Sequence, residues 1–461
     1  MQINLRQDSG VTPDATRVLT AASRKTLREG NKLRPEDRVA NDWYRFVLSF
    51  PPHLVRNYIE RFALGSGDRV LDPFCGTGTT LVECKRLHIR SVGIESNSMA
   101  WFASRVKVDW GVDPDGLLNH AREVARMTAE RLESEGIADL QDLPLFKSHH
   151  RVVSTLRTLP PQAQQLLLKN SISPLPLHKA LTLLDVLDRY KDERFDRHER
   201  LALAKAAVCS ISNLHFGPEV GVGPAKPDAP VVTAWMNGLE AMAEDLRLLQ
   251  GKSGAEAVVH RADSRDIAAV LEPHSVDAVI TSPPYPNEKD YTRTTRLESV
   301  LLGFVRSKQD LRSLKQNLVI SNTRGVYKGD NDDAVVASHH EIQRIANAIE
   351  RRRIELGKNS GFERLYARVT RLYFGGMTRH LSQLRAVLRP GARLAYVVGD
   401  QASYLQVMIR TGQLLAEIAA SLGYEVVGID LFRTRLATAT KQQLREEVVV
   451  LRWPGGTGCA A

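Results

Sequence analysis

Cysteine is scarce in this chain of 461 residues, and the four present, Cys75, Cys84, Cys209 and Cys459, are scattered. Their spacing is not that of metal ligands, and an intracellular protein would keep them reduced. His339 and His340 form a pair without further ligand candidates. The sequence therefore predicts neither a disulfide framework nor a metal site.

Long apolar runs are also missing. No stretch is long enough to span a bilayer, and the polar start, MQINLRQDSG, does not resemble a signal peptide. Hydrophobic residues make up 43% of the chain and charged residues 25%, as in globular proteins, and the length exceeds what one core usually needs. We expect a cytoplasmic protein with no membrane partner.

Negative charge is outnumbered. Lys and Arg total 63 against 53 Asp and Glu, which gives a formal charge of +10. An excess of positive charge favours a polyanionic partner such as nucleic acid. Charge alone does not establish one, because many basic proteins bind no nucleic acid.

The most informative positive signal is the tetrapeptide Ser282-Pro283-Pro284-Tyr285, which follows the apolar run at residues 276–280. A buried strand would place this turn at its C-terminal end, where open α/β sheets bind ligands. Two prolines fix φ and remove two backbone donors, which leaves nearby carbonyls free of a regular ladder. Carbonyls, a hydroxyl and an aromatic ring suit a flat substrate that carries an amino group.

A second motif is GDRVLDPFCGTGTT, which predicts a strand at residues 69–71, then Asp72, a loop with Gly76 and Gly78, and a helix from about Thr79. Glycines allow a ligand to approach the backbone closely. The third glycine of the dinucleotide fingerprint is absent. The next predicted strand ends at Glu95, a position from which a carboxylate typically accepts ribose hydroxyls, and a third ends near Asp263.

Taken together, LDPFCGTGTT and TSPPY resemble the S-adenosylmethionine-dependent DNA methyltransferases that act on exocyclic amino groups. The first string resembles their FxGxG cofactor loop, and the second their (S/N/D)PP(Y/F) catalytic motif. The resemblance covers roughly residues 43–110, 255–290 and 370–455. It implies a doubly wound, Rossmann-like α/β methyltransferase sheet.

The resemblance also assigns roles. It places catalysis on Ser282, Pro283, Pro284 and Tyr285. It places S-adenosylmethionine against Asp72, Pro73, Phe74, Gly76, Gly78, Thr79, Glu95 and Asp263. The Ser282 hydroxyl and the Pro283 carbonyl would accept the two amino hydrogens, and Tyr285 would stack on a base flipped out of the duplex.

Two insertions interrupt this pattern. We expect a polar arm at 1–42, a cofactor half at 43–111, a helical insertion at 112–254, the catalytic strand and motif at 255–285, a basic insertion at 286–370, and the rest of the methyltransferase domain at 371–461. The basic insertion interleaves Tyr with Arg, so it is the candidate target-recognition segment. Its Arg293, Arg296 and Arg324 are candidate contacts to DNA.

The target base is left open between two choices. Ser at the first motif position is typical of cytosine-N4 enzymes in the family, whereas Asp or Asn is typical of adenine-N6 enzymes. An RNA guanine-N2 methyltransferase and a non-catalytic nucleic-acid-binding protein stay open as well. The DNA enzyme would associate with the nucleoid and pair with a cognate restriction or defence nuclease. The sequence indicates no oligomeric state.

Overall fold

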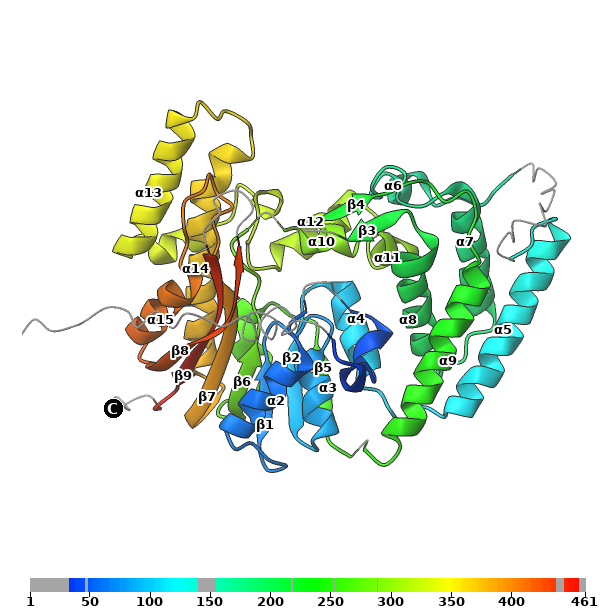
Figure 1. The fold of residues 1–461 in the computed structure, drawn as a ribbon, viewed down its shortest axis with the longest axis horizontal. Helices are drawn as coiled ribbons and strands as arrows, with labels where there is room; N and C mark the ends of the chain where they lie inside the picture. Colours follow the sequence, from blue (N-terminus) through cyan, green and yellow to red (C-terminus); the bar gives the residue numbers. More distant parts are fainter. Residues whose placement is uncertain are drawn as a thin grey trace, which may run out of the picture.

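The computed structural model describes residues 33–45, 49–139, 155–216, 219–252, 254–287, 289–436 and 443–455. Its centre is a seven-stranded sheet in the order β5-β2-β1-β6-β7-β9-β8 (Figure 1). The strands are β1 (Arg69–Asp72), β2 (Arg90–Ile94), β5 (Ala257–His260), β6 (Val276–Thr281), β7 (Leu388–Gly399), β8 (Glu425–Leu436) and β9 (Gln443–Arg452).

Strand direction makes this a mostly parallel sheet with one antiparallel strand. The pairs β5-β2, β2-β1, β1-β6 and β6-β7 are parallel, and β9 runs antiparallel between β7 and β8. The expected Rossmann-like fold is therefore confirmed. The chain leaves β1 for β2 on one side and returns through β6 on the other, which opens a ligand crevice at the C-terminal ends of these strands.

Helices cover both faces of the sheet because neighbouring strand residues point to opposite sides. On β1, Val70 packs with α2 (Pro52–Arg61) and α3 (Thr79–Arg86), whereas Leu71 packs with α14 (Tyr366–Leu384) and α15 (Thr411–Ser421). Helix α4 (Ser98–Lys107) follows β2 and joins α3 in a further core.

The described residues within 112–254 form a mainly helical lobe beside the sheet (Figure 1). Its core is continuous with that of α3 and α4. The lobe contains α5 (Pro114–Ser134), α6 (Pro161–Gln164), α7 (Pro174–Arg189), α8 (Asp196–Ala206), a π-helical turn (Ala207–Ile211), the antiparallel hairpin β3 (Leu214–Phe216) and β4 (Val220–Val222), and α9 (Val231–Leu249).

The segment after the predicted catalytic turn, residues 282–285, is also helical. It comprises α10 (Tyr291–Thr294), α11 (Arg296–Leu301), α12 (Lys308–Gln316), α13 (His340–Glu355) and the short 3-10 turns η5 (Thr323–Gly325), η6 (Asp332–Val336) and η7 (Glu363–Leu365). The expected boundary at residue 370 falls inside α14, which begins at Tyr366. Among the described residues, no helix is long and apolar enough to cross a membrane.

The N-terminal arm differs from the expectation where it is described. Residues 1–32 lie outside the described part of the chain, but Asp37 and Asn41 are buried. Asp37 pairs with Arg56 at 2.6 Å, and the Asn41 amide donates to Glu83 at 3.0 Å. The sequence looked loosely ordered because these partners lie on α2 and α3, away from the arm.

Candidate active site

The catalytic turn is positioned by β6, whose residues are almost all buried between β1 and β7. Ser282 follows the strand directly, and its Oγ donates to the Val397 carbonyl of β7 at 3.1 Å. Because its proton is used in this bond, the Ser282 oxygen can act as an acceptor for another donor. The turn therefore presents an acceptor at the sheet edge.

The Tyr285 ring lies against Gly399, the last residue of β7. A Cβ added at Gly399 would lie 3.1 Å from Tyr285 Cε2, tighter than an ordinary carbon contact. Burial raises the pKa of Tyr285 well above its usual value, and Glu446 adds to the shift. The phenol therefore stays neutral, and the absence of a side chain at Gly399 lets the ring sit close to the sheet.

Asp72 ends β1 and is fully buried. Its Oδ1 accepts hydrogen bonds from Thr281 Oγ1 at 2.6 Å and from the Phe74 amide at 3.2 Å. Burial raises the pKa of Asp72 to about 6, only partly offset by the hydrogen bond from Thr281. This carboxylate ties the cofactor loop to the end of the catalytic strand.

The surroundings of the two loop glycines differ. Gly76 has a φ of +51° and faces open space, whereas Gly78 has a φ of +84°, and a Cβ there would lie 2.5 Å from Ser104 Oγ of α4. A side chain at Gly78 would be strained and would also clash. The loop can therefore pack on α4 only with glycine at this position.

Glu95 follows β2 and closes the loop from the other side. It accepts hydrogen bonds from the Gly76 amide at 2.9 Å and from the Asn97 amide at 2.7 Å. Burial raises the pKa of Glu95 to about 7, against the opposing effect of these amides. Its ionisation is thus placed near neutral pH, which is unusual for a glutamate.

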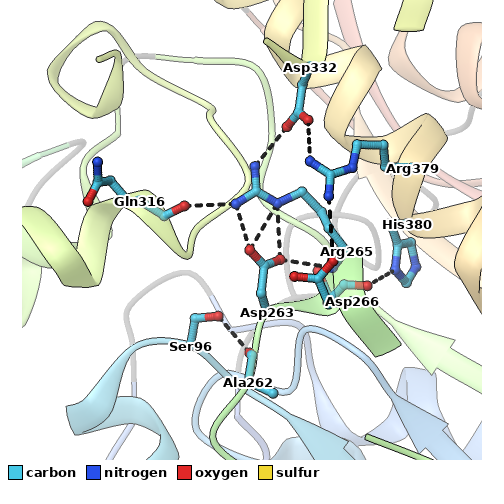
Figure 2. Close-up of polar contacts among 10 residues, drawn as sticks. Ser96, Ala262, Asp263, Arg265, Asp266, Gln316, Asp332, Arg379 and His380 are labelled. Carbon is cyan, nitrogen blue, oxygen red and sulfur yellow. Dashed lines mark hydrogen bonds and ion pairs between the residues drawn. The ribbon is translucent and has the colours of Figure 1, made fainter. Parts of the chain in front are cut away.

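Asp263 lies in different surroundings from Glu95. Strand β5 ends earlier, at His260, and Asp263 forms an ion pair with Arg265 at 2.6 Å (Figure 2). Its neighbours Ala262 and Ser264 line the cavity beside the catalytic turn, but Asp263 does not. The sequence could not indicate this, because the pattern at the strand end is the same whether the carboxylate faces a ligand or an arginine.

One cavity of about 510 Å³ joins the catalytic turn to the cofactor loop. Of the predicted site residues, its lining includes Pro73, Phe74, Gly76, Thr79, Glu95, Ser282, Pro283, Pro284 and Tyr285. Asp72, Gly78 and Asp263 support it from outside the lining. Two sequence motifs more than 200 residues apart, at 71–80 and 281–285, therefore meet in one chamber.

The three predicted DNA-contacting arginines do not line this cavity. Arg296 donates to the carbonyls of Thr292 at 3.0 Å and Leu166 at 3.2 Å, so its guanidinium serves packing inside the protein. Arg293 is partly buried, and the Arg324 guanidinium lies 5.4 Å from the centre of the Phe362 ring.

Several lining residues lie outside the sequence motifs. Asn287, Lys289 and Tyr291 follow the catalytic motif in the string NEKDY, and adjacency to the motif was their only signal. Glu219 reaches the cavity from the β3–β4 hairpin, and Arg435 from β8. Nothing in the local sequence marks these two residues, because only the tertiary fold brings their elements to the site.

The chamber fits S-adenosylmethionine. Its volume lies within the roughly 300–1,000 Å³ of small-molecule sites. Two lining atoms, Thr77 Oγ1 and Asn322 Oδ1, are buried and have no hydrogen-bond partner among the described residues. Two carboxylates, on Glu95 and just behind the loop on Asp72, favour a ligand that carries positive charge and hydroxyl donors.

Comparison with known proteins agrees with this chemistry. Residues 22–101 match the family model of N6/N4 DNA methylases, described as "DNA methylase". The chain is 26% identical over 447 residues to the type II methyltransferase M.BsoBI of Geobacillus stearothermophilus, covering 89% of this chain and 84% of that protein. It is 23% identical to the type II methyltransferase M.AvaI of Nostoc sp., covering 96% and 91%.

A shorter match has a different name. Over 126 residues the chain is 29% identical to a tRNA (guanine(10)-N2)-dimethyltransferase of Methanothermobacter thermautotrophicus, covering 27% of this chain and 28% of that protein. The two longer matches span both motifs and both insertions. Together with the sheet order and the cavity that joins the two motifs, they show that the chain is similar to the amino-group DNA methyltransferases.

Proposed function

We propose that this enzyme transfers a methyl group from S-adenosylmethionine to N4 of cytosine in DNA, at a specific sequence. The observation that carries the proposal is the shared cavity, in which the Ser282-Pro-Pro-Tyr turn faces the chamber bordered by Glu95. The description of the matching family model, "DNA methylase", supports DNA as the substrate. The serine at the first motif position favours cytosine over adenine.

The chain's own residues supply binding and positioning. Glu95 would accept the ribose hydroxyls, and Phe74 and Gly76 would enclose the methionine part. When bound, S-adenosylmethionine supplies an electrophilic methyl group next to the catalytic turn. Asp263, already paired with Arg265, would act on the adenine end only through the backbone of its neighbours.

The acceptor nitrogen needs help because its lone pair is delocalised into the ring. Ser282 Oγ and the Pro283 carbonyl would accept the two amino hydrogens and localise that lone pair. The bond from Ser282 to Val397 supports this role, because it leaves the serine oxygen as an acceptor. Tyr285 would stack on the flipped base. Positioning rather than a covalent intermediate then accounts for the rate.

The proposal is tested by the modified nucleoside. Purified protein is incubated with labelled S-adenosylmethionine and unmodified genomic DNA, and the digested DNA is analysed by mass spectrometry. We expect N4-methylcytosine. N6-methyladenine would move the assignment to the other base. Labelled methylguanosine in tRNA, with unlabelled DNA, would overturn the DNA proposal.

The type II names of the relatives also support a role in restriction and modification. We propose that the methylated sequence is the target of a cognate nuclease. Sequencing of DNA from cells that express the enzyme would give the modified sequence. DNA from these cells should resist nucleases that cut that sequence and remain sensitive to others.

A further inference from the structure

A cluster of charges surrounds Arg265 (Figure 2), and the nearby Ala262 and Ser264 line the cavity. Arg265, on the turn after β5, is 8% exposed, and Asp332, from the segment after the catalytic turn, is 3% exposed. Arg265 pairs with Asp263 at 2.6 Å and with Asp332 at 2.7 Å, and Arg379 of α14 contacts the other oxygen of Asp332 at 2.8 Å. Two arginines thus balance two enclosed carboxylates.

All three nitrogens of the Arg265 guanidinium donate hydrogen bonds inside the protein. Nε bonds both oxygens of Asp263, Nη1 bonds Asp332, and Nη2 bonds Asp263 and the Gln316 carbonyl at 2.8 Å. The planar guanidinium directs its donors in fixed directions and can bond several separate acceptors at once. A lysine ammonium could not bond the same set of partners. Arg265 does not line the cavity.

The carbonyl that Arg265 holds is next to a wall of the cavity. Residues 317–322, called the wall segment below, follow Gln316 and all line the chamber. Ala262 and Ser264, on either side of Asp263, line it as well. Arg265 is thus the link between the strand-end side of the chamber and a wall that belongs to the basic insertion.

Other contacts fix the rest of the wall segment. The Lys315 ammonium bonds Asp290 at 2.8 Å and the Arg324 carbonyl at 3.1 Å, and the Tyr404 hydroxyl donates to the Ser321 carbonyl at 3.0 Å. Asp332 itself is seated on α14, where a Cβ added at Gly375 would lie 1.8 Å from the Asp332 carbonyl oxygen. The cluster therefore links Asp332, which is packed against α14, to the chamber through Arg265.

We infer that Arg265 is a positioning residue for the reaction: through Gln316 and Asp332 it holds the wall segment in the place where it completes the cofactor chamber. The inference rests on the proposed use of S-adenosylmethionine. Its consequence is that cofactor affinity depends on how the basic insertion is docked, although Arg265 does not line the cavity.

Arg379 provides a matched control. It pairs with the same Asp332 at 2.8 Å and with Asp266 at 3.5 Å, and its side chain is 41% exposed. Replacing it removes these two ion pairs from the same cluster and leaves the bond from Arg265 to Gln316 intact. Asp332→Asn is the second test variant, because Arg265 then keeps Asp263 as a partner and no unpaired charge is created.

The experiment measures binding of S-adenosylmethionine by calorimetry in the full-length protein, with steady-state methylation of DNA and hydrogen exchange of residues 317–322. Arg265→Gln and Asp332→Asn should each weaken cofactor binding about tenfold, because they uncouple two contacting elements. The KM for the cofactor should rise more than kcat falls, and the wall amides should exchange faster. Arg265→Lys should be intermediate, and Arg379→Gln should stay within about twofold of wild type.

Three outcomes would overturn the inference. One is unchanged cofactor affinity in folded Arg265→Gln or, if that variant does not fold, in Asp332→Asn. The second is an equal loss in Arg379→Gln, and the third is unaltered exchange of the wall segment. Failure of the proposed function looks different, because the wild-type protein itself would then show no cofactor binding while the exchange comparison would still report on Arg265.

Discussion

We expect Glu95 to make binding of S-adenosylmethionine sensitive to pH. Its pKa is raised by burial to about 7, well above the usual value for glutamate, so the folded protein takes up this proton as the pH falls through neutrality. The protonated form is a poorer acceptor for ribose hydroxyls. Affinity for S-adenosylmethionine should therefore fall about tenfold from pH 8 to pH 6, as expected for a group that titrates near 7.

Calorimetry at several pH values checks this, with Glu95→Gln as the control. The variant should bind more weakly than wild type at pH 8, and its affinity should be flat over the same range. Glu95→Ala should lose roughly 1.5–3 kcal/mol of binding free energy at pH 8. If the cofactor affinity of Glu95→Gln still changed with pH, the titrating group would be another residue.

Ser282 and Tyr285 should separate chemistry from binding. We expect Tyr285→Ala to abolish most turnover with little loss of cofactor affinity, because the ring lies at the base side of the cavity against Gly399. Ser282→Ala should reduce kcat less, because the Pro283 carbonyl remains as an acceptor. Methylation rates and cofactor dissociation constants measured on both variants test this. Wild-type rates in both would remove the motif from catalysis.

At the scale of elements, the packing of α14 on η6 reverses the usual effect of glycine. Alanine in place of a helical glycine normally stabilises by about 0.5–1 kcal/mol. At Gly375 the new Cβ would collide with the Asp332 carbonyl, and backbone cannot swing aside as a side chain can. Gly375→Ala should therefore destabilise by roughly 1–3 kcal/mol or more.

Gly238 of α9 is the matched control. A Cβ there would meet Ala202 Cβ at 3.5 Å, an ordinary contact. Urea unfolding should show Gly238→Ala at or above wild-type stability and Gly375→Ala clearly below it. Equal stability of the two variants would mean that α14 and η6 are not packed as described.

The same elements show how far sequence reasoning reaches. The strands at β1 and β6 and the helix at α3 follow from apolar runs, glycines and prolines near them in the chain. The pairing of Arg265 with Asp332, and the close approach of Gly375 to the same aspartate, join residues far apart in the sequence. No local pattern encodes such partners, so Asp263 resembled a free strand-end carboxylate.

At the scale of the whole molecule, the excess of positive charge should act through cations at the cavity. Lys289 and Arg435 line it, and the Lys289 ammonium makes no hydrogen bond or ion pair within the described part of the chain. Replacing Lys289 with Met should weaken DNA binding. The slope of log affinity against log salt should fall by about 0.9 for each phosphate that the protein no longer neutralises.

The control replaces Arg126 and Arg344, which are exposed but already paired with glutamates of their own helices at 2.5 and 2.6 Å. Fluorescence anisotropy over a series of salt concentrations should show little change in their slope. Arg296 is a poor probe, because its replacement would also break the hydrogen bond to Leu166. If the salt slope changed more in the control variant than in the cavity variant, the DNA would bind at another face of the protein.

The position of the wall segment limits which residues can be exchanged when chimeras are made between related methyltransferases. A chimera that replaces residues 286–370 as one cassette would carry away residues 317–322 and Asp332, and with them one side of the cofactor chamber. Such a chimera would show impaired cofactor binding along with any new target preference. A graft that keeps residues 286–336 and exchanges only the part around α13 would leave the chamber intact, so the tolerable junctions lie well inside the insertion rather than at its ends.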